Sequence, residues 1–106
     1  MRIQVRGDDT IDQQARTYAE YRVFAALTQL ARAEQVRDVR IALRRNNRHG
    51  AGDSVACLIT VLVAGSKPIR VLARGEHPYA AINRAVESLR GATPTGRIDG
   101  GGVEIG

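Results

Sequence analysis

The sequence is poor in cysteine and in aromatic residues: its 106 residues include one cysteine, no tryptophan, one phenylalanine and three tyrosines. A single cysteine, Cys57, excludes an internal disulfide and agrees with a reducing compartment. Long apolar runs are absent as well, so no segment has the length of a membrane span, and the opening residues MRIQVRGDD do not read as a signal peptide. These absences predict a cytoplasmic protein without membrane contact.

Lysine is scarce too, because Lys67 is the one lysine among 16 basic residues and the others are arginine. The formal net charge is +5. Arginine suits bidentate contacts with phosphate, and a basic domain is compatible with nucleic acid. A GC-rich genome that encodes arginine in place of lysine would give the same excess, so composition alone leaves nucleic-acid binding open.

Residues that could form a catalytic or metal site are not grouped in the sequence. His49 and His77 fall in different expected elements, and Cys57 occupies an inward strand position without a basic neighbour, which is typical of a buried, inert thiol. The Gly-rich stretches RHGAGD and GRIDGGG do not follow a strand and open a helix, as a phosphate-binding loop would. We therefore expect no enzyme activity, metal, cofactor or small-molecule substrate.

The clearest element is the stretch HPYAAINRAVESL, residues 77–89. Pro78 suits the first position of a helix, and Gly91 stands where the helix would end. The apolar residues recur at helical spacing as one core-facing stripe: Tyr79, Ile82, Ala85, Val86 and Leu89. The polar residues fall on the other side: Asn83, Arg84, Glu87 and Arg90.

Another helix, the first in chain order, is predicted over residues 11–33, with Thr10 as its cap and Gln13 completing a capping box. Its expected buried face is built largely of alanine: Ile11, Ala15, Ala19, Val23, Ala26 and Leu30. Alternating patterns predict strands over residues 1–6, 36–45, 54–64 and 69–74, with a hairpin turn at Gly65-Ser66.

The order of these elements, β-α-β-β-β-α, predicts an α+β fold. A right-handed crossover should join two parallel strands, and the later strands should follow as antiparallel hairpins. The result is a four-stranded mixed sheet with two helices packed on one face and the other face open. We expect one domain over residues 1–91 and a flexible, Gly-rich C-terminal tail over residues 92–106.

Charge and apolar residues meet on the predicted open face. Five arginines lie between Arg37 and Arg48, and Arg40 and Arg44 should share the open face with Arg70 and Arg74. The charge pattern makes these residues candidate RNA-binding residues: Arg40, Arg44, Arg45 and Arg48. A solvated sheet face protected from edge pairing and aggregation is the equal alternative.

Several large apolar residues are also expected at the surface. They are candidate protein-interface residues: Leu58, Leu62 and Leu72 on the open sheet face, with Tyr21 and Phe24 projecting outward from the first helix. A second copy of the chain could pair there and form a homodimer.

Several motifs resemble the ribosome hibernation-promoting factor family, also described as RaiA-like or sigma-54 modulation proteins. Tyr79-Ala80-Ala81-Ile82-Asn83 is similar to the family's Y-A-A-I-D at the start of its last helix, and Ala73-Arg74-Gly75 resembles its small-x-Gly strand end. Tyr18-Ala19-Glu20-Tyr21-Arg22-Val23 looks like the family's Y-V-E-x-[KR]-L, and Cys57-Leu58-Ile59-Thr60-Val61 is similar to its central strand. The resemblance covers residues 1 to about 90.

The resemblance implies a non-enzymatic, ribosome-associated factor that binds rRNA of the small subunit and inhibits translation in idle ribosomes under stress. Basic residues on the two helices contact rRNA in that family, and Arg22 fits one such position. Arg22 also lies near the apolar face of its helix, so the alternative is that its stem packs beside the second helix. Lysines of the family are replaced here at three positions: Ala25, Thr28 and Ser88. Arg84 and Arg90 could substitute for them in part. The alternative is a protein-interaction or dimerisation module that keeps the fold and has lost rRNA binding.

Overall fold

A computed structural model describes residues 1–29, 33–47 and 53–92. In chain order the elements are β1 (Arg2–Gly7), α1 (Gln13–Leu27), a 3-10 turn (Ala33–Gln35), β2 (Val36–Asn47), β3 (Asp53–Val63), β4 (Ile69–Gly75) and α2 (Pro78–Ala92). The predicted α+β order is therefore confirmed. The predicted hairpin turn is confirmed too, because Gly65 has a φ of 75°, a backbone conformation that glycine adopts without steric cost.

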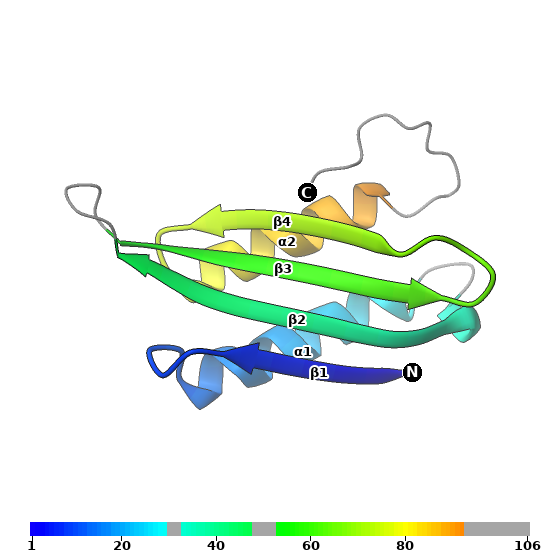
Figure 1. Ribbon diagram of the computed structural model, residues 1–106, viewed down its shortest axis with the longest axis horizontal. Coiled ribbons are helices and arrows are strands. Elements are labelled where there is room, and N and C mark those ends of the chain that lie inside the picture. The colour runs from blue at the N-terminus through cyan, green and yellow to red at the C-terminus, as the bar shows by residue number, and fades with distance from the viewer. Residues whose placement is uncertain (30–32, 48–52, 93–106) are drawn as a thin grey trace.

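The four strands form one mixed sheet in the order β1-β2-β3-β4. β1 pairs with β2 in parallel, whereas β3 is antiparallel to both of its neighbours, as the crossover and hairpin arguments predict. Both helices lie behind the sheet in Figure 1, so one sheet face is covered and the other is open.

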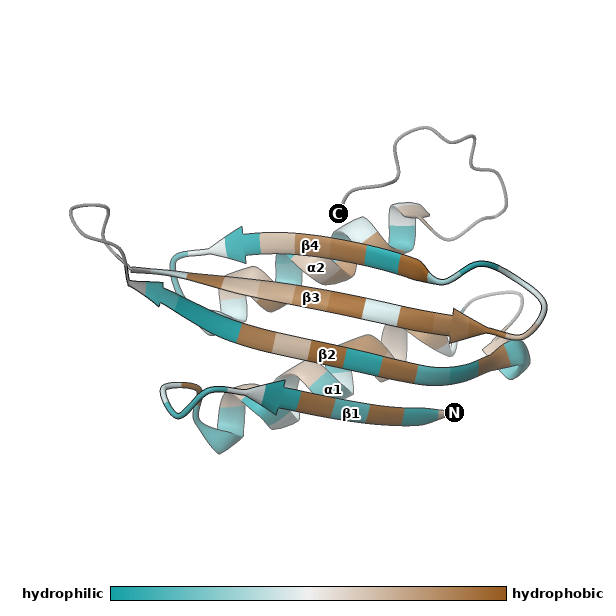
Figure 2. Cartoon of the chain, viewed as in Figure 1, coloured by the Kyte–Doolittle hydropathy of each residue, from teal (hydrophilic) through white to brown (hydrophobic). Residues whose placement is uncertain are grey.

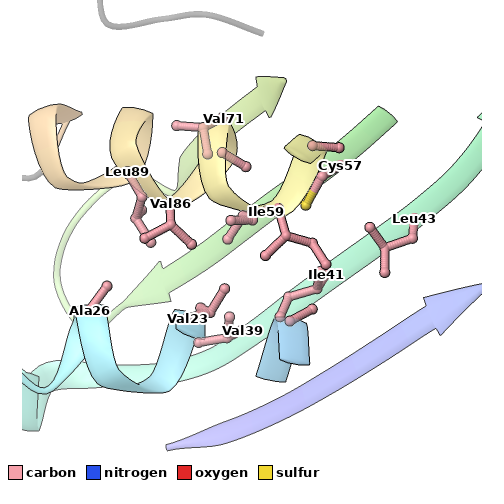
Figure 3. Packing of buried hydrophobic residues seen from close by; sticks show 14 of the residues in the cluster. Val23, Ala26, Val39, Ile41, Leu43, Cys57, Ile59, Val71, Val86 and Leu89 are labelled. Atoms are coloured by element: carbon pink, nitrogen blue, oxygen red, sulfur yellow. The ribbon is translucent and has the colours of Figure 1, made fainter. Parts of the chain in front are cut away.

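The core lies between the helices and the covered face of the sheet. The alternating apolar residues of β2 and β3 expected to point inward are buried, including Ile41, Cys57 and Ile59, except that Val63 at the end of β3 is only partly buried. Figure 3 shows side chains of these strands and of both helices pointing toward one another between the two layers. Ala15 and Ala19 are fully buried on α1, and their small side chains let this helix lie close to the sheet.

Helix α1 is shorter than the predicted helix over residues 11–33. It begins at Gln13, and its cap is Asp12, whose carboxylate accepts a hydrogen bond of 2.9 Å from the amide of Ala15. Thr10 is not the cap because it lies two residues before Asp12, outside the helix start, where its amide and hydroxyl donate to the Asp8 carboxylate. At the other end α1 stops at Leu27, which is buried, and the predicted face residue Leu30 lies outside the described residues.

Helix α2 is longer than predicted. Gly91 does not end it, since the helix continues to Ala92, one residue into the expected tail. A glycine stops a helix when it adopts a left-handed backbone, and Gly91 does not have a positive φ. Residues 93–106 lie outside the described residues, so the tail and the domain boundary stay predictions.

Candidate nucleic-acid interface

The open sheet face is organised in rows that run across the strands. Strand register sets three neighbouring rows: Gln4, Arg40, Thr60 and Arg70; Arg6, Ala42, Leu58 and Leu72; and Arg44, Ala56 and Arg74. The middle row, which we call the apolar row, is apolar from Ala42 to Leu72 and has Arg6 at its β1 end. It is flanked on both sides by a row with an arginine on β2 and another on β4. Figure 2 shows β3, which runs between these arginines, as hydrophobic along most of its length. We call these three rows the arginine-framed face.

The spacing of the arginines follows from sheet geometry. Arg40 and Arg70 are separated by one strand, so their backbones lie about 10 Å apart, and Arg40 and Arg44 lie about 13 Å apart along β2. Arg40 also lies 3.9 Å from the Asp38 carboxylate, but its side chain remains 64% exposed. An ion pair this exposed is weak and leaves the guanidinium available to an anion.

One end of this face is hollowed. An open hollow of about 700 Å³ is lined by Arg6, Asp8, Arg44, Leu58 and Leu72, among other residues. The Thr10 hydroxyl and the amide of Arg45 hydrogen-bond to the Asp8 carboxylate and lower its pKa. Asp8 is therefore a fixed negative charge at the rim, whereas the rest of the lining is apolar or positive.

The helix arginines implied by the resemblance do not form one cluster. Arg22 lies between the helices, where its Nε donates to the side-chain oxygen of Asn83 at 3.3 Å. Arg84 projects toward β4 and donates from Nη1 to the carbonyl oxygen of Arg74 at 2.8 Å. Arg90 is exposed in the last turn of α2. Arg22 and Arg84 therefore serve the fold through different contacts.

The sequence predicted that Asn83 lies on the polar side of α2, away from the packed stripe, and the structure corrects this. Asn83 is half-buried, and besides the Arg22 contact it accepts a hydrogen bond of 2.7 Å from the Tyr18 hydroxyl. The rings of Tyr18 and Tyr79 also meet edge to face, 5.1 Å apart. The side of α2 that carries Asn83 is thus part of the interface between the helices.

The arginines predicted from the charge pattern, Arg40, Arg44, Arg45 and Arg48, also do not form one group in the structure. Arg45 lies on the helix side of β2, opposite in direction to Arg44, and is half-buried. Arg45 therefore does not share the open face with Arg40 and Arg44, because successive residues of a strand point to opposite faces. Arg48 lies outside the described residues.

Two arginines of β1 were missed as candidate site residues. Arg2 and Arg6 are exposed and share the open face with Arg40 and Arg44. The alternation of β1 with Ile3 and Val5 pointing inward already contained this signal, and the parallel pairing of β1 with β2 brings it next to the β2 arginines.

The predicted interface residues fall on two separate surfaces. Leu58 and Leu72 are direct neighbours, but the row of Thr60 and Arg70 separates them from Leu62. Tyr21 and Phe24 lie elsewhere, on α1, where they line a hollow of about 540 Å³ together with Met1 and Ile3. Tyr21 is 66% exposed and Phe24 49% exposed, so the helix residues project outward as predicted.

A metal-binding cluster and a membrane-spanning helix both have requirements that can be compared with the described residues. Within residues 1–29, 33–47 and 53–92, no three potential metal ligands come together. None of the helices in these ranges is long and apolar enough to cross a membrane. Cys57 is buried, and burial raises the pKa of its thiol to about 12.

Comparison with known proteins supports the fold. No protein-family model and no curated protein matches the chain. Among solved structures, a ribosomal subunit interface protein from Coxiella burnetii superposes with a TM-score of 0.70. The alignment covers 86% of this chain and 91% of that chain at 18% sequence identity. The chain therefore has the fold of a ribosomal subunit interface protein.

Proposed function

We propose that this chain is a non-enzymatic, ribosome-associated factor that binds rRNA of the small subunit and inhibits translation in idle ribosomes. The observation that carries the proposal is the fold likeness to a ribosomal subunit interface protein over nearly the whole chain. The net charge of +5 and the arginine-framed face support it, because rRNA is a polyanion. Its place of action would be the cytoplasm.

A factor of this kind would act by occupying a site. Arginine side chains that neutralise rRNA phosphates release counterions, and this release supplies most of the free energy of a charge-driven complex. No covalent step is needed, since a rigid domain of this size on the small subunit would exclude other ligands from the same space. Inhibition would then follow the fraction of ribosomes that carry the factor.

Co-sedimentation with purified ribosomal subunits tests the proposal directly. The protein should pellet with the small subunit at about 50 mM salt and much less at about 200 mM salt, because each phosphate contact steepens the salt dependence. Adding the protein to a cell-free translation reaction should lower the yield in proportion to the bound fraction. If the protein stays in the supernatant at both salt concentrations, the proposal fails.

A protein-interaction module is the second candidate. The specific observation in its favour is the apolar hollow beside β1, where Met1 is 48% exposed near the outward Tyr21 and Phe24. Exposed apolar patches of this kind are typical of protein interfaces. If the protein does not pellet with ribosomes but light scattering shows a stable dimer, this second function would be favoured.

A further inference from the structure

We propose that the arginine-framed face is a platform for single-stranded RNA, with phosphates on the arginines and bases over the apolar row. The inference rests on the proposed function only for the class of partner. It goes beyond that function because it moves the contact surface from the helices, where the resemblance implies it, to the opposite side of the molecule.

The arrangement of side chains on this face carries the inference. Four arginines stand at the corners of a rectangle whose sides are about 10 Å and 13 Å: Arg40, Arg44, Arg70 and Arg74. Leu58 lies inside the rectangle and Leu72 on its β4 side, and Leu72 is 38% exposed. A positively charged frame around an apolar centre offers contacts to both the backbone and the base faces of a single strand.

A second copy of the chain is a poor occupant of the same face. A two-fold dimer would place this surface against itself. Its exposed arginines are numerous: Arg2, Arg6, Arg40, Arg44, Arg70 and Arg74. Asp38 and Asp8 are the acidic residues that accompany them within the described residues. Arginine would therefore meet arginine, and like charges brought together in an interface are strongly unfavourable.

The apolar row decides between a single strand and a duplex. In a double helix the base faces are stacked inside, so Leu58 and Leu72 would meet sugars, phosphates and base edges but no base faces. A single strand can splay its bases onto an apolar surface and onto the planes of arginine guanidinium groups. The hollow beside Leu58, Leu72 and Arg44 gives room for such a base.

The helix arginines are less suited to the same task. Arg22 is committed to Asn83 and Arg84 to the Arg74 carbonyl, and these contacts point the two side chains in different directions. By contrast, Arg70 and Arg74 are exposed side chains two rows apart on β4. RNA that bound Arg22 or Arg84 would have to replace these contacts, so binding to the sheet arginines should be more favourable than binding to the helix arginines.

The test measures binding of a fluorescein-labelled single-stranded RNA of about ten nucleotides by anisotropy. The sheet variant is Arg70→Glu/Arg74→Glu, and its matched control is Arg84→Glu/Arg90→Glu on α2, which changes the net charge by the same amount. We expect the sheet variant to raise the dissociation constant about tenfold or more, and to flatten the salt slope by about 1.4. The control should change both far less, and Leu72→Ser should weaken binding severalfold without changing the slope.

Several results would overturn the inference. Equal losses in the two charge variants would mean that only net charge matters, and a larger loss in the control would place the RNA on the helices. Tighter binding of duplex RNA than of the single strand, or of a polyglutamate peptide than of either RNA, would point to another partner. Circular dichroism checks that each variant is folded, and Arg70→Gln/Arg74→Gln replaces the sheet variant if that one is not.

The ribosome assay separates this inference from the proposed function. A protein that binds the oligonucleotide through the sheet but does not pellet with the small subunit would support the inference and refute the function. If the sheet variant and the unmutated protein pellet equally and bind the oligonucleotide equally, the inference fails while the function stands.

Discussion

At the scale of single residues, Asn83 shows how a polar side chain joins two helices. Its side-chain oxygen accepts from both Tyr18 and Arg22, so one residue of α2 satisfies two donors of α1. Replacing it with alanine leaves the half-buried Tyr18 hydroxyl without that acceptor. We expect Asn83→Ala to lower the free energy of unfolding by about 1–2 kcal/mol, measured by urea denaturation. Asn83→Asp keeps the acceptor and should be close to neutral, and equal losses in both variants would argue against this role.

A second prediction at this scale concerns Cys57. Desolvation raises the pKa of this thiol from 9.0 to about 12. The thiolate is the form of cysteine that attacks thiol reagents, so the folded protein should label slowly at pH 9 and the urea-unfolded protein rapidly. Rapid labelling of the folded protein would mean that β3 is shifted by one residue and that Cys57 faces the open side.

The same pKa gives a stability prediction with a definite sign. Between pH 9.0 and about 12 the folded state keeps the Cys57 proton and the unfolded state loses it. The unfolding free energy should therefore fall as pH rises through that window. Cys57→Ala removes this contribution, so its stability should decline less over the same range. Parallel declines in chemical denaturation would show that the thiol is not buried.

At the scale of elements, Gly75 fixes how α2 begins. A Cβ at this position would lie 2.6 Å from the amide nitrogen of Ala81 and 2.7 Å from the Cβ of Ala80. The start of α2 therefore packs directly on the end of β4. We expect Gly75→Ala to destabilise the protein by about 1–3 kcal/mol in a thermal melt. Gly91→Ala is the matched control, since a Cβ there meets nothing within 4 Å, and it should be neutral or stabilising.

The sequence predicted the strands better than the helix ends, and the reason is physical. Strand alternation is a property of the whole segment, so Ile41 and Ile59 reveal the buried face wherever the strand starts or stops. Helix ends depend on one or two hydrogen bonds. The helix begins at Gln13 with Asp12 as its cap, and Thr10 donates to Asp8 instead. Thr10 and Asp12 are both acceptable cap residues, so residue types alone do not show which of them the helix uses.

The candidate site, like the fold, was predicted only in part from the sequence. Alternation placed Arg40 and Arg44 on the open face with Leu58 and Leu72, and the structure has them there. What the pattern could not give was the pairing of Arg22 with Asn83, which joins residues 61 positions apart in the chain. Such contacts arise from the crossing of two helices, which no local pattern encodes.

At the scale of the whole molecule, the two faces of the sheet differ in charge and in exposure to solvent. The helix-covered face is apolar and buried, whereas the open face concentrates arginine with little compensating acid. Like charges that share a small surface repel one another, and this repulsion is relieved either by a bound polyanion or by dissolved salt. In the free protein at low ionic strength, this repulsion should therefore lower the free energy of unfolding.

This imbalance leads to a prediction that needs no ligand. Raising sodium chloride from about 10 mM to about 150 mM shortens the Debye length to about 8 Å, less than the spacing of Arg40 and Arg70. We expect the melting temperature to rise by about 2–4 °C, from relief of about 0.5 kcal/mol of repulsion. In Arg70→Gln/Arg74→Gln the rise should be roughly halved, because two of the four framing charges are gone. In Arg84→Gln/Arg90→Gln, which removes the same charge from α2, it should be nearly unchanged. A melting temperature that falls with salt in the unmutated protein would mean that attractive pairs such as Arg40 with Asp38 outweigh the repulsion across the arginine-framed face.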